Sequence, residues 1–286
     1  MIRIILITLL LATSVVLYAD VIEKAYEFSS PEISQAGEYH TINFTGCLLT
    51  APTGHPLMPY QSVALLLPPG HVATSVEVIM NGETELKGEF MLFPRQYARP
   101  FSEGGSGIFV KDEDVYGKDA AYPEKAFGEL NTQFMNGYAV AICNFTPLKY
   151  NPFSGRASWY KNVTVKITTA EDRSAADALQ NLNTSKRIHQ SVFELIQNPA
   201  AAGRYPAMEN RAESYDLLYI TPQAFAGDLQ QLVDFYFPRG LIGKVATTEE
   251  IYAAMPGQDN PEKIRNYIIQ EYQDHGIAHV TLGGDV

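Results

Sequence analysis

The chain has 286 residues, of which 46% are hydrophobic and 19% are charged, a composition typical of a folded protein of one or two domains. Its 21 basic and 32 acidic residues give a formal net charge of −11. This charge excludes the basic field that attracts DNA or RNA, so we expect no nucleic-acid partner.

Residues 1–19 have the pattern of a secretory signal peptide. Arg3 lies in a short basic start, residues 4–17 are almost wholly apolar, and Ala19 precedes Asp20 at the expected cleavage position. The apolar run is shorter than the roughly 20 residues that a membrane-spanning helix needs, although an uncleaved anchor is the alternative. We therefore predict a secreted protein without membrane association once the signal is removed.

Residues 20–170 have the texture of a β-rich domain. Alternating or short apolar runs are punctuated by proline and glycine, and no segment has helical periodicity over the length of a helix. The pair Asn81-Gly82 predicts a hairpin turn with residues 83–93 as the returning strand, and residues 94–136 predict a long surface excursion. These features favour an antiparallel, sandwich-like domain. The clearest strands are expected at residues 41–45, 62–67, 75–80, 137–145 and 158–169.

Residues 171–213 predict a helical segment followed by a linker. Residues 171–196 have helix-forming composition, and the run of proline, alanine and glycine in residues 198–203 is typical of an exposed connector. Arg204 and Arg211 lie in this connector, where an activating protease could cut. The alternative is that they are ordinary exposed arginines with no such role.

Residues 214–286 change to a β-α-β-α-β order, with strands expected at 215–220, 241–247 and 277–282. Thr221 is expected to cap a first helix, which Pro238 should end early and Gly240 should close. A second helix is expected from Asn260 to Gly276. This order predicts a parallel sheet with crossover helices. Because three strands and two helices leave one edge of the sheet uncovered, we expect an incomplete domain that continues beyond Val286.

The chain offers few groups for catalysis or for binding a cofactor. Cys47 and Cys143 are the only thiols, and neither has a recognisable base nearby; a disulfide between them is possible, and Cys143 is expected to be a small buried side chain. His275 and His279 are separated by a helix-ending glycine, so they do not form a zinc pair. The turn after residue 220 lacks the glycines of a dinucleotide site. We expect no metal and no cofactor.

Several segments resemble the gingipain-type cysteine peptidases. YDLLYIT (215–221), VATTEEIY (245–252), PGQDNPEKIRNYI (256–268) and LGGD (282–285) are similar to the start of the catalytic domain of that family. GHPLMP (54–59), FTPLKYNP (145–152) and WYKNV (159–163) are similar to its β-rich propeptide. The catalytic-domain match is the more specific of the two, because its segments occur in order at compatible spacing.

The resemblance implies a secreted zymogen whose caspase-like α/β sheet carries a His/Cys dyad that acts on protein or peptide substrates. It also implies a propeptide that contacts the catalytic domain of the same chain. The dyad is expected beyond Val286, so no catalytic residue is assigned here and this chain alone is expected to be inactive. Asp285 would lie on the active-site rim, with a plain turn residue as the alternative.

The domains expected on this basis are a signal peptide (1–19), a propeptide domain (20–170), a helical segment and linker (171–213), and the first part of a peptidase domain (214–286). A second interpretation is a secreted, non-catalytic β-sandwich protein for binding or structure, with a degenerate α/β module. A histidine and a cysteine at the ends of further strands would distinguish the two.

Overall fold

The structure is a computed structural model that describes residues 20–98, 100, 102, 107–206 and 214–284. The predicted signal peptide lies outside the described residues. None of the helices in the described ranges is long and apolar enough to cross a membrane.

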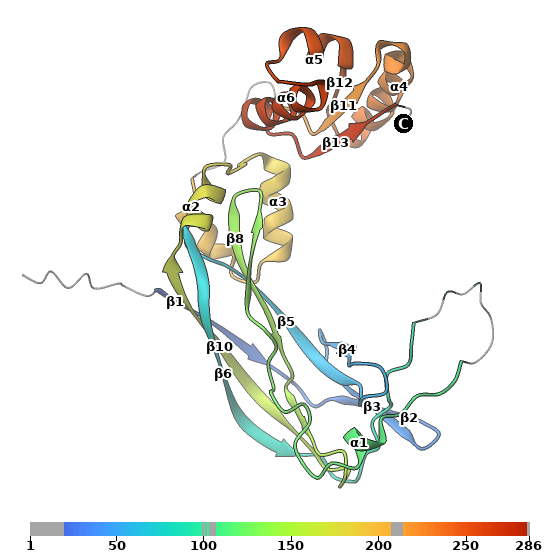
Figure 1. Cartoon of the computed structure of the whole chain (residues 1–286). Coiled ribbons are helices and arrows are strands. Elements are labelled where there is room, and N and C mark those ends of the chain that lie inside the picture. The colour runs from blue at the N-terminus through green and yellow to red at the C-terminus, as the bar shows by residue number, and fades with distance from the viewer. Residues whose placement is uncertain (1–19, 99, 101, 103–106, 207–213, 285–286) are drawn as a thin grey trace, which may run out of the picture.

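The first part of the chain is built from antiparallel sheets (Figure 1). One sheet has the order β1-β10-β6, with β9 added to β10, and a second has the order β4-β5-β8-β7. A two-stranded sheet, β2-β3, and a short helix, α1, complete this part. The predicted antiparallel, sandwich-like domain is therefore confirmed. The elements are β1 (Asp20–Glu27), β2 (Glu32–Ala36), β3 (Tyr39–Asn43), β4 (Leu48–Thr50), β5 (Met58–Leu66), β6 (His71–Glu85), α1 (Glu113–Tyr116), β7 (Asn131–Met135), β8 (Tyr138–Phe145), β9 (Leu148–Tyr150) and β10 (Ala157–Glu171).

The second sheet buries side chains on both of its faces, because successive residues of β5 point to opposite sides. Val63 and Leu65 are fully buried in the main core, which they share with side chains of β10 such as Val165. Ala64 and Leu66 point to the opposite face and belong to a separate cluster with the helices that follow β10. Burying a valine or leucine side chain contributes about 1.5–3 kcal/mol, so packing on both faces stabilises the strand.

The hairpin predicted at Asn81-Gly82 is wrong. Strand β6 runs straight through this pair and stays in register with β10, from Glu85 opposite Ser158 to His71 opposite Glu171, with one bulge. Gly82 has a positive φ of 73° inside the strand. Since β10 is equally long, the pairing with β10 extends β6 past a local turn signal.

A two-residue turn does form at Asn136-Gly137, between β7 and β8. The φ angles of 50° and 89° at these two residues fit the turn that favours Asn-Gly in hairpins. A Cβ added to Gly137 would lie 2.5 Å from the Cα of Leu182, so only glycine fits. Strand β7 lies inside the stretch that was predicted to be a loop.

Two helices and a 3₁₀ turn follow β10. Helix α2 (Arg173–Leu179) and helix α3 (Lys186–Leu195) lie in the segment predicted to be helical. Ile188 and Val192 of α3 pack on the outer face of the second sheet. The stretch predicted to be an exposed connector, residues 198–203, forms most of the 3₁₀ helix η2 (Pro199–Arg204). Pro199, Ala200 and Gly203 are exposed, whereas Ala201 and Ala202 are partly buried against the same face of the sheet.

The last part contains a parallel sheet, as predicted, and its strand order is β12-β11-β13. Gly240 and Gly276 end their helices, as predicted, and both adopt left-handed conformations. Helix α4 ends before Pro238, also as predicted. Thr221 does not cap a helix; it ends β11, and a 3₁₀ turn starts the helical segment instead. The elements are β11 (Leu217–Thr221), η3 (Gln223–Phe225), α4 (Ala226–Tyr236), η4 (Phe237–Arg239), β12 (Gly243–Thr247), α5 (Thr248–Ala254), α6 (Asn260–His275) and β13 (His279–Leu282).

Strand β13 lies at the edge of this sheet, and its side chains are exposed, with Leu282 at 65%. Helix α4 also presents exposed apolar side chains, among them Leu232 and Phe235. The described residues therefore leave an apolar edge and helix face of the parallel sheet uncovered.

Candidate functional site

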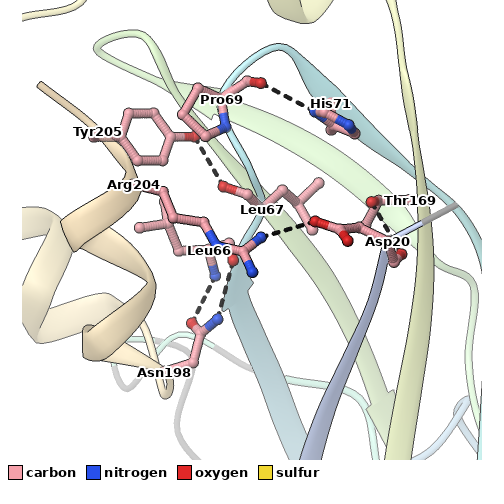
Figure 2. Close-up of polar contacts among 9 residues, drawn as sticks. All are labelled: Asp20, Leu66, Leu67, Pro69, His71, Thr169, Asn198, Arg204 and Tyr205. Atoms are coloured by element: carbon pink, nitrogen blue, oxygen red, sulfur yellow. Dashed lines mark hydrogen bonds and ion pairs between the residues drawn. The ribbon is translucent and has the colours of Figure 1, made fainter. Parts of the chain in front are cut away.

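Arg204, the first of the two predicted processing residues, ends η2 and lies against the start of β1 (Figure 2). Its Nη1 donates to Oδ2 of Asp20 at 2.9 Å, and both side chains are more than half exposed. An exposed pair of this kind contributes about 0–1 kcal/mol. Asp20 is the first residue of β1, so this contact joins the start of the β-rich part to the connector.

Asn198 holds the connector against the free edge of β5. Its Oδ1 accepts from the backbone N–H of Leu66 at 2.8 Å, and its Nδ2 donates to the backbone oxygen of Leu66 at 3.0 Å (Figure 2). The side-chain amide thus takes the place of a neighbouring strand. Gln197 binds the same edge two residues earlier in β5. Its backbone N–H donates to the backbone oxygen of Ala64, and its Oε1 accepts from the backbone N–H of Ala64 at 3.3 Å. Its Nε2 donates to the backbone oxygen of Ser62 at 3.0 Å. A β-strand edge that would otherwise leave buried amide groups unpaired is closed by two side chains.

Tyr205 follows Arg204 directly and is buried, at 6% exposure. Its hydroxyl donates to the backbone oxygen of Leu67 at 3.1 Å and accepts from the backbone N–H of Ala139 at 3.2 Å. The centroid of its ring lies 4.8 Å from the ring centroid of Tyr138. Burial raises the pKa of Tyr205, because the charged phenolate would lose its hydration there. The residue that follows the candidate processing position is therefore held inside the β-rich part.

Arg211 and Asp285, the other two residues singled out from the sequence, lie outside the described residues. Their predicted roles stay predictions.

The two cysteines are free and buried. Burial raises the pKa of Cys47 and of Cys143 to about 11, so both remain thiols at neutral pH. Neither can supply a thiolate nucleophile without leaving the core. The prediction that Cys143 is a small buried side chain is confirmed. In the part of the chain that the structure describes, no group of three or more His, Cys, Asp or Glu side chains could hold a metal ion.

The carboxyl ends of the parallel strands meet at one edge, which is where ligands bind in open α/β sheets. Thr247 ends β12 and caps α5 through a reciprocal pair of hydrogen bonds with Glu250. Thr221 ends β11, and its buried hydroxyl has no hydrogen-bond partner among the described residues. A Cβ added to Gly283 would lie 3.3 Å from this hydroxyl, so the chain leaving β13 passes close by. This edge has polar groups, but Cys47 and Cys143 lie elsewhere, in the core of the β-rich part.

The β-rich part contacts the parallel sheet through Asp216, which lies just before β11. The Nε of Arg187, on α3, donates to Oδ1 of Asp216 at 2.7 Å. Oδ2 of the same carboxylate accepts from the backbone N–H of Ile242 at 3.0 Å. Asp216 thus binds α3 with one oxygen and the segment before β12 with the other.

Further hydrogen bonds cross the same junction. The hydroxyl of Tyr272, on α6, donates to the backbone oxygen of Asn181 at 2.9 Å. Nδ2 of Asn183 donates to the backbone oxygen of Ile277 at 3.4 Å. Asp216 and Ile277 precede β11 and β13, so these contacts lie at the amino ends of the parallel strands. They leave the opposite, carboxyl edge of the sheet free.

A buried carboxylate stabilises this amino end. Glu271 accepts hydrogen bonds from Tyr215 and, at 2.8 Å, from Lys244, and its side chain is 6% exposed. Burial by itself would raise the pKa of Glu271, but the hydrogen bonds from Lys244, Tyr215 and Tyr267 together hold it below its usual value. Glu271 therefore stays ionised and ties β12, α6 and the start of β11 together.

Tyr205, Asn198, Arg187 and Asp216 were not singled out from the sequence. An aromatic residue within a connector of small and polar residues is a signal that could have pointed to Tyr205. The roles of Asn198 and Arg187 depend on strands and helices far along the chain, and no local pattern marks them.

Two family models match the chain in tandem. The model Propeptide_C25 matches residues 21–197, more than half of the chain, and the model for peptidase family C25 matches residues 210–286. The chain belongs to peptidase family C25. It is a gingipain-type cysteine peptidase sequence with its propeptide, and the two matches fall on the β-rich part and on the parallel sheet. Arg204 and Tyr205 lie between them.

The relatives of this C25 chain include the gingipains of Porphyromonas gingivalis. Gingipain R2 (strain ATCC BAA-308 / W83) is 26% identical over 248 residues, which are 85% of this chain and 32% of gingipain R2. Gingipain R1 is 27% identical over 193 residues, which are 63% of this chain and 19% of gingipain R1. The C25 chain thus spans about a third or less of the length of these curated relatives.

Two solved structures of gingipains are similar to this C25 chain. One concerns the zymogenic latency of gingipain K from Porphyromonas gingivalis, with a TM-score of 0.46, 16% identity, and coverage of 53% of this chain and 88% of that one. The other is a complex of the pro- and mature domains of RgpB from the same organism, with a TM-score of 0.49, 17% identity, and coverage of 63% and 93%. Both TM-scores are below 0.5, so neither similarity adds to the description of the fold.

Proposed function

We propose that this chain is the propeptide and the first part of the peptidase domain of a secreted gingipain-like cysteine endopeptidase that is made as a zymogen. The tandem order of the two C25 matches, each on its own folding unit, carries this proposal. The pattern of residues 1–19 supports secretion. The parent enzyme would hydrolyse protein or peptide substrates.

The catalytic His/Cys dyad of the parent would come from residues after Val286. The burial of Cys47 and Cys143, with the pKa of both raised to about 11, supports this, because these thiols are unsuited to nucleophilic attack. The exposed edge strand β13 and the exposed apolar side chains of α4 are what a continuing sheet would cover. This chain alone would therefore not hydrolyse peptides. Asp285, directly after the last strand, would lie on the rim of the completed site.

The propeptide would act in cis. The hydrogen bonds from Arg187 and Asn183 to the parallel sheet support an attachment at the amino ends of the strands. Activation would cut the connector after Arg204 or Arg211. Arg204 is the better candidate, because it lies between the two family matches, whereas Arg211 falls inside the peptidase match.

The experiment is to express the complete reading frame that carries this chain and to assay peptide hydrolysis before and after processing of the connector. The proposal predicts hydrolysis that rises on processing and is abolished by alkylation of one cysteine outside residues 20–286. A matched sample of the present chain should show no hydrolysis. A processed protein without thiol-dependent activity would contradict the proposal and would favour a non-catalytic β-sandwich binding or structural protein.

A further inference from the structure

The Arg204–Tyr205 peptide bond joins two residues in very different surroundings. Arg204 is exposed and makes one ion pair with Asp20, whereas Tyr205 is 6% exposed and lies in a hydrophobic cluster. This cluster belongs to the β-rich part. We define the Tyr205 socket as three members of the cluster, Leu66, Tyr138 and Val140, together with the backbone groups of Leu67 and Ala139 that bind the hydroxyl.

The hydroxyl of Tyr205 is inserted into the ladder between β5 and β8. The register that pairs Leu66 with Val140 places Leu67 opposite Ala139. The N–H of Leu67 donates directly to the oxygen of Ala139 at 2.9 Å. The reciprocal bond is replaced by the hydroxyl, which accepts from the N–H of Ala139 and donates to the oxygen of Leu67. Removing the hydroxyl would leave two backbone groups without their partner.

An endopeptidase cannot reach this bond in the folded state. Proteolysis takes place in exposed backbone that is free of secondary structure and buried anchors. Here η2 fixes the residues on the amino side of the bond, and the socket holds the residue on its carboxyl side. Cleavage therefore requires a local opening in which Tyr205 leaves the socket. When opening and closing are fast, the rate of cleavage follows the population of the open form.

We propose that the Tyr205 socket locks the Arg204–Tyr205 bond, so that cutting after Arg204 is controlled by withdrawal of Tyr205 and not by access to Arg204 itself. This inference rests on the proposed function in one respect, since it takes Arg204 as the activation site. The ion pair with Asp20 is secondary, because both of its side chains are more than half exposed.

The test is limited proteolysis of the folded full chain by an added arginine-specific endopeptidase. The product that begins at Tyr205 is quantified by mass spectrometry. Tyr205→Phe keeps the ring and removes the bridging hydroxyl, so cleavage after Arg204 should be roughly tenfold faster than in the parent chain. Tyr205→Ala also empties the socket and should be roughly a hundredfold faster. Asp20→Asn should change the rate by less than about threefold.

Tyr116→Phe is the matched control. Tyr116 is also 6% exposed, and its hydroxyl donates to the backbone oxygen of Leu92, in a different region of the β-rich part. The Tyr116→Phe variant should leave the rate of cleavage after Arg204 unchanged. Circular dichroism establishes that each variant is folded, and Tyr205→Phe serves if Tyr205→Ala does not fold.

Two results would overturn the lock. In one, both Tyr205 variants are cut after Arg204 at the rate of the parent chain. In the other, Tyr116→Phe accelerates this cut as much as Tyr205→Phe, which would make global stability the cause. Because the protease is added, these results are independent of the parent enzyme's own activity, whose absence would count against the proposed function instead.

Discussion

Replacing Arg187 by alanine should weaken the attachment of the propeptide to the parallel sheet. The guanidinium of Arg187 lies 2.7 Å from the carboxylate of Asp216, across the junction. The other described hydrogen bonds of this junction, from Asn183 and Tyr272, go to uncharged oxygen atoms. The Arg187–Asp216 pair is therefore the described contact that we expect to matter most.

The exposure of the two side chains sets the size of the effect. Their exposed fractions are 37% for Arg187 and 21% for Asp216, so the pair is neither a surface pair nor a fully buried one. Surface pairs contribute about 0–1 kcal/mol, and hydrogen bonds to charged groups contribute about 1.5–3 kcal/mol. Allowing for solvent screening, we expect a loss of about 1 kcal/mol, which is about fivefold in a dissociation constant.

The assay requires the two parts to be held together by non-covalent contacts alone. Residues 207–213 are replaced by the recognition sequence of a site-specific endopeptidase, the chain is cut there, and dissociation is followed on dilution by fluorescence anisotropy. Arg173→Ala is the control, because Arg173 forms an exposed pair with Asp177 within α2. Asp216→Asn removes the charge and keeps an acceptor for Ile242, so it completes a double-mutant cycle with Arg187→Ala. Equal dissociation constants for Arg187→Ala and Arg173→Ala would refute the reasoning.

Three other predictions concern stability and reactivity. Because the pKa of Glu271 is lowered on folding, its carboxylate contributes stability that is present above the unfolded pKa of 4.5 and is lost as the pH falls through the folded pKa. The urea midpoint of Glu271→Gln should therefore be lower than that of the parent chain at pH 7, and it should fall less on acidification. Cys47 and Cys143, whose pKa burial raises to about 11, should not react with iodoacetamide at pH 8 until the chain is unfolded; rapid labelling of the folded chain would contradict their burial. Gly137→Ala should lower the free energy of unfolding by about 2 kcal/mol or more, whereas Gly203→Ala, where an added Cβ meets nothing within 4 Å, should be nearly neutral by chemical denaturation.

The order of elements was predictable from the sequence wherever a local signal and the tertiary structure agree. Gly240 and Gly276 end their helices in left-handed conformations, as a glycine at that position favours. The β-α-β-α-β order was sufficient to predict a parallel sheet. The two Asn-Gly pairs show the limit: Asn136-Gly137 makes a hairpin turn, whereas Gly82 lies inside β6, because β10 supplies a continuous partner on both sides of it.

The candidate site was predictable only in part. Arg204 was marked by its residue type and by the composition around it. Its environment was not, because the connector packs onto the free edge of β5, and that edge exists only once the sheets have formed. The same reason explains why Tyr205 and the Arg187–Asp216 pair were missed: each contact joins residues that are far apart in the chain or that belong to different folding units.

The most direct test of the central claim is the peptidase activity of the complete polypeptide that carries this chain, measured while its connector is intact and again after the connector has been cut. The account predicts a protein that is latent before the cut, active after it, and inhibited by a thiol reagent. Equal activity in both states, or no thiol-dependent activity after the cut, would contradict the interpretation of this chain as the amino-terminal part of a cysteine peptidase zymogen.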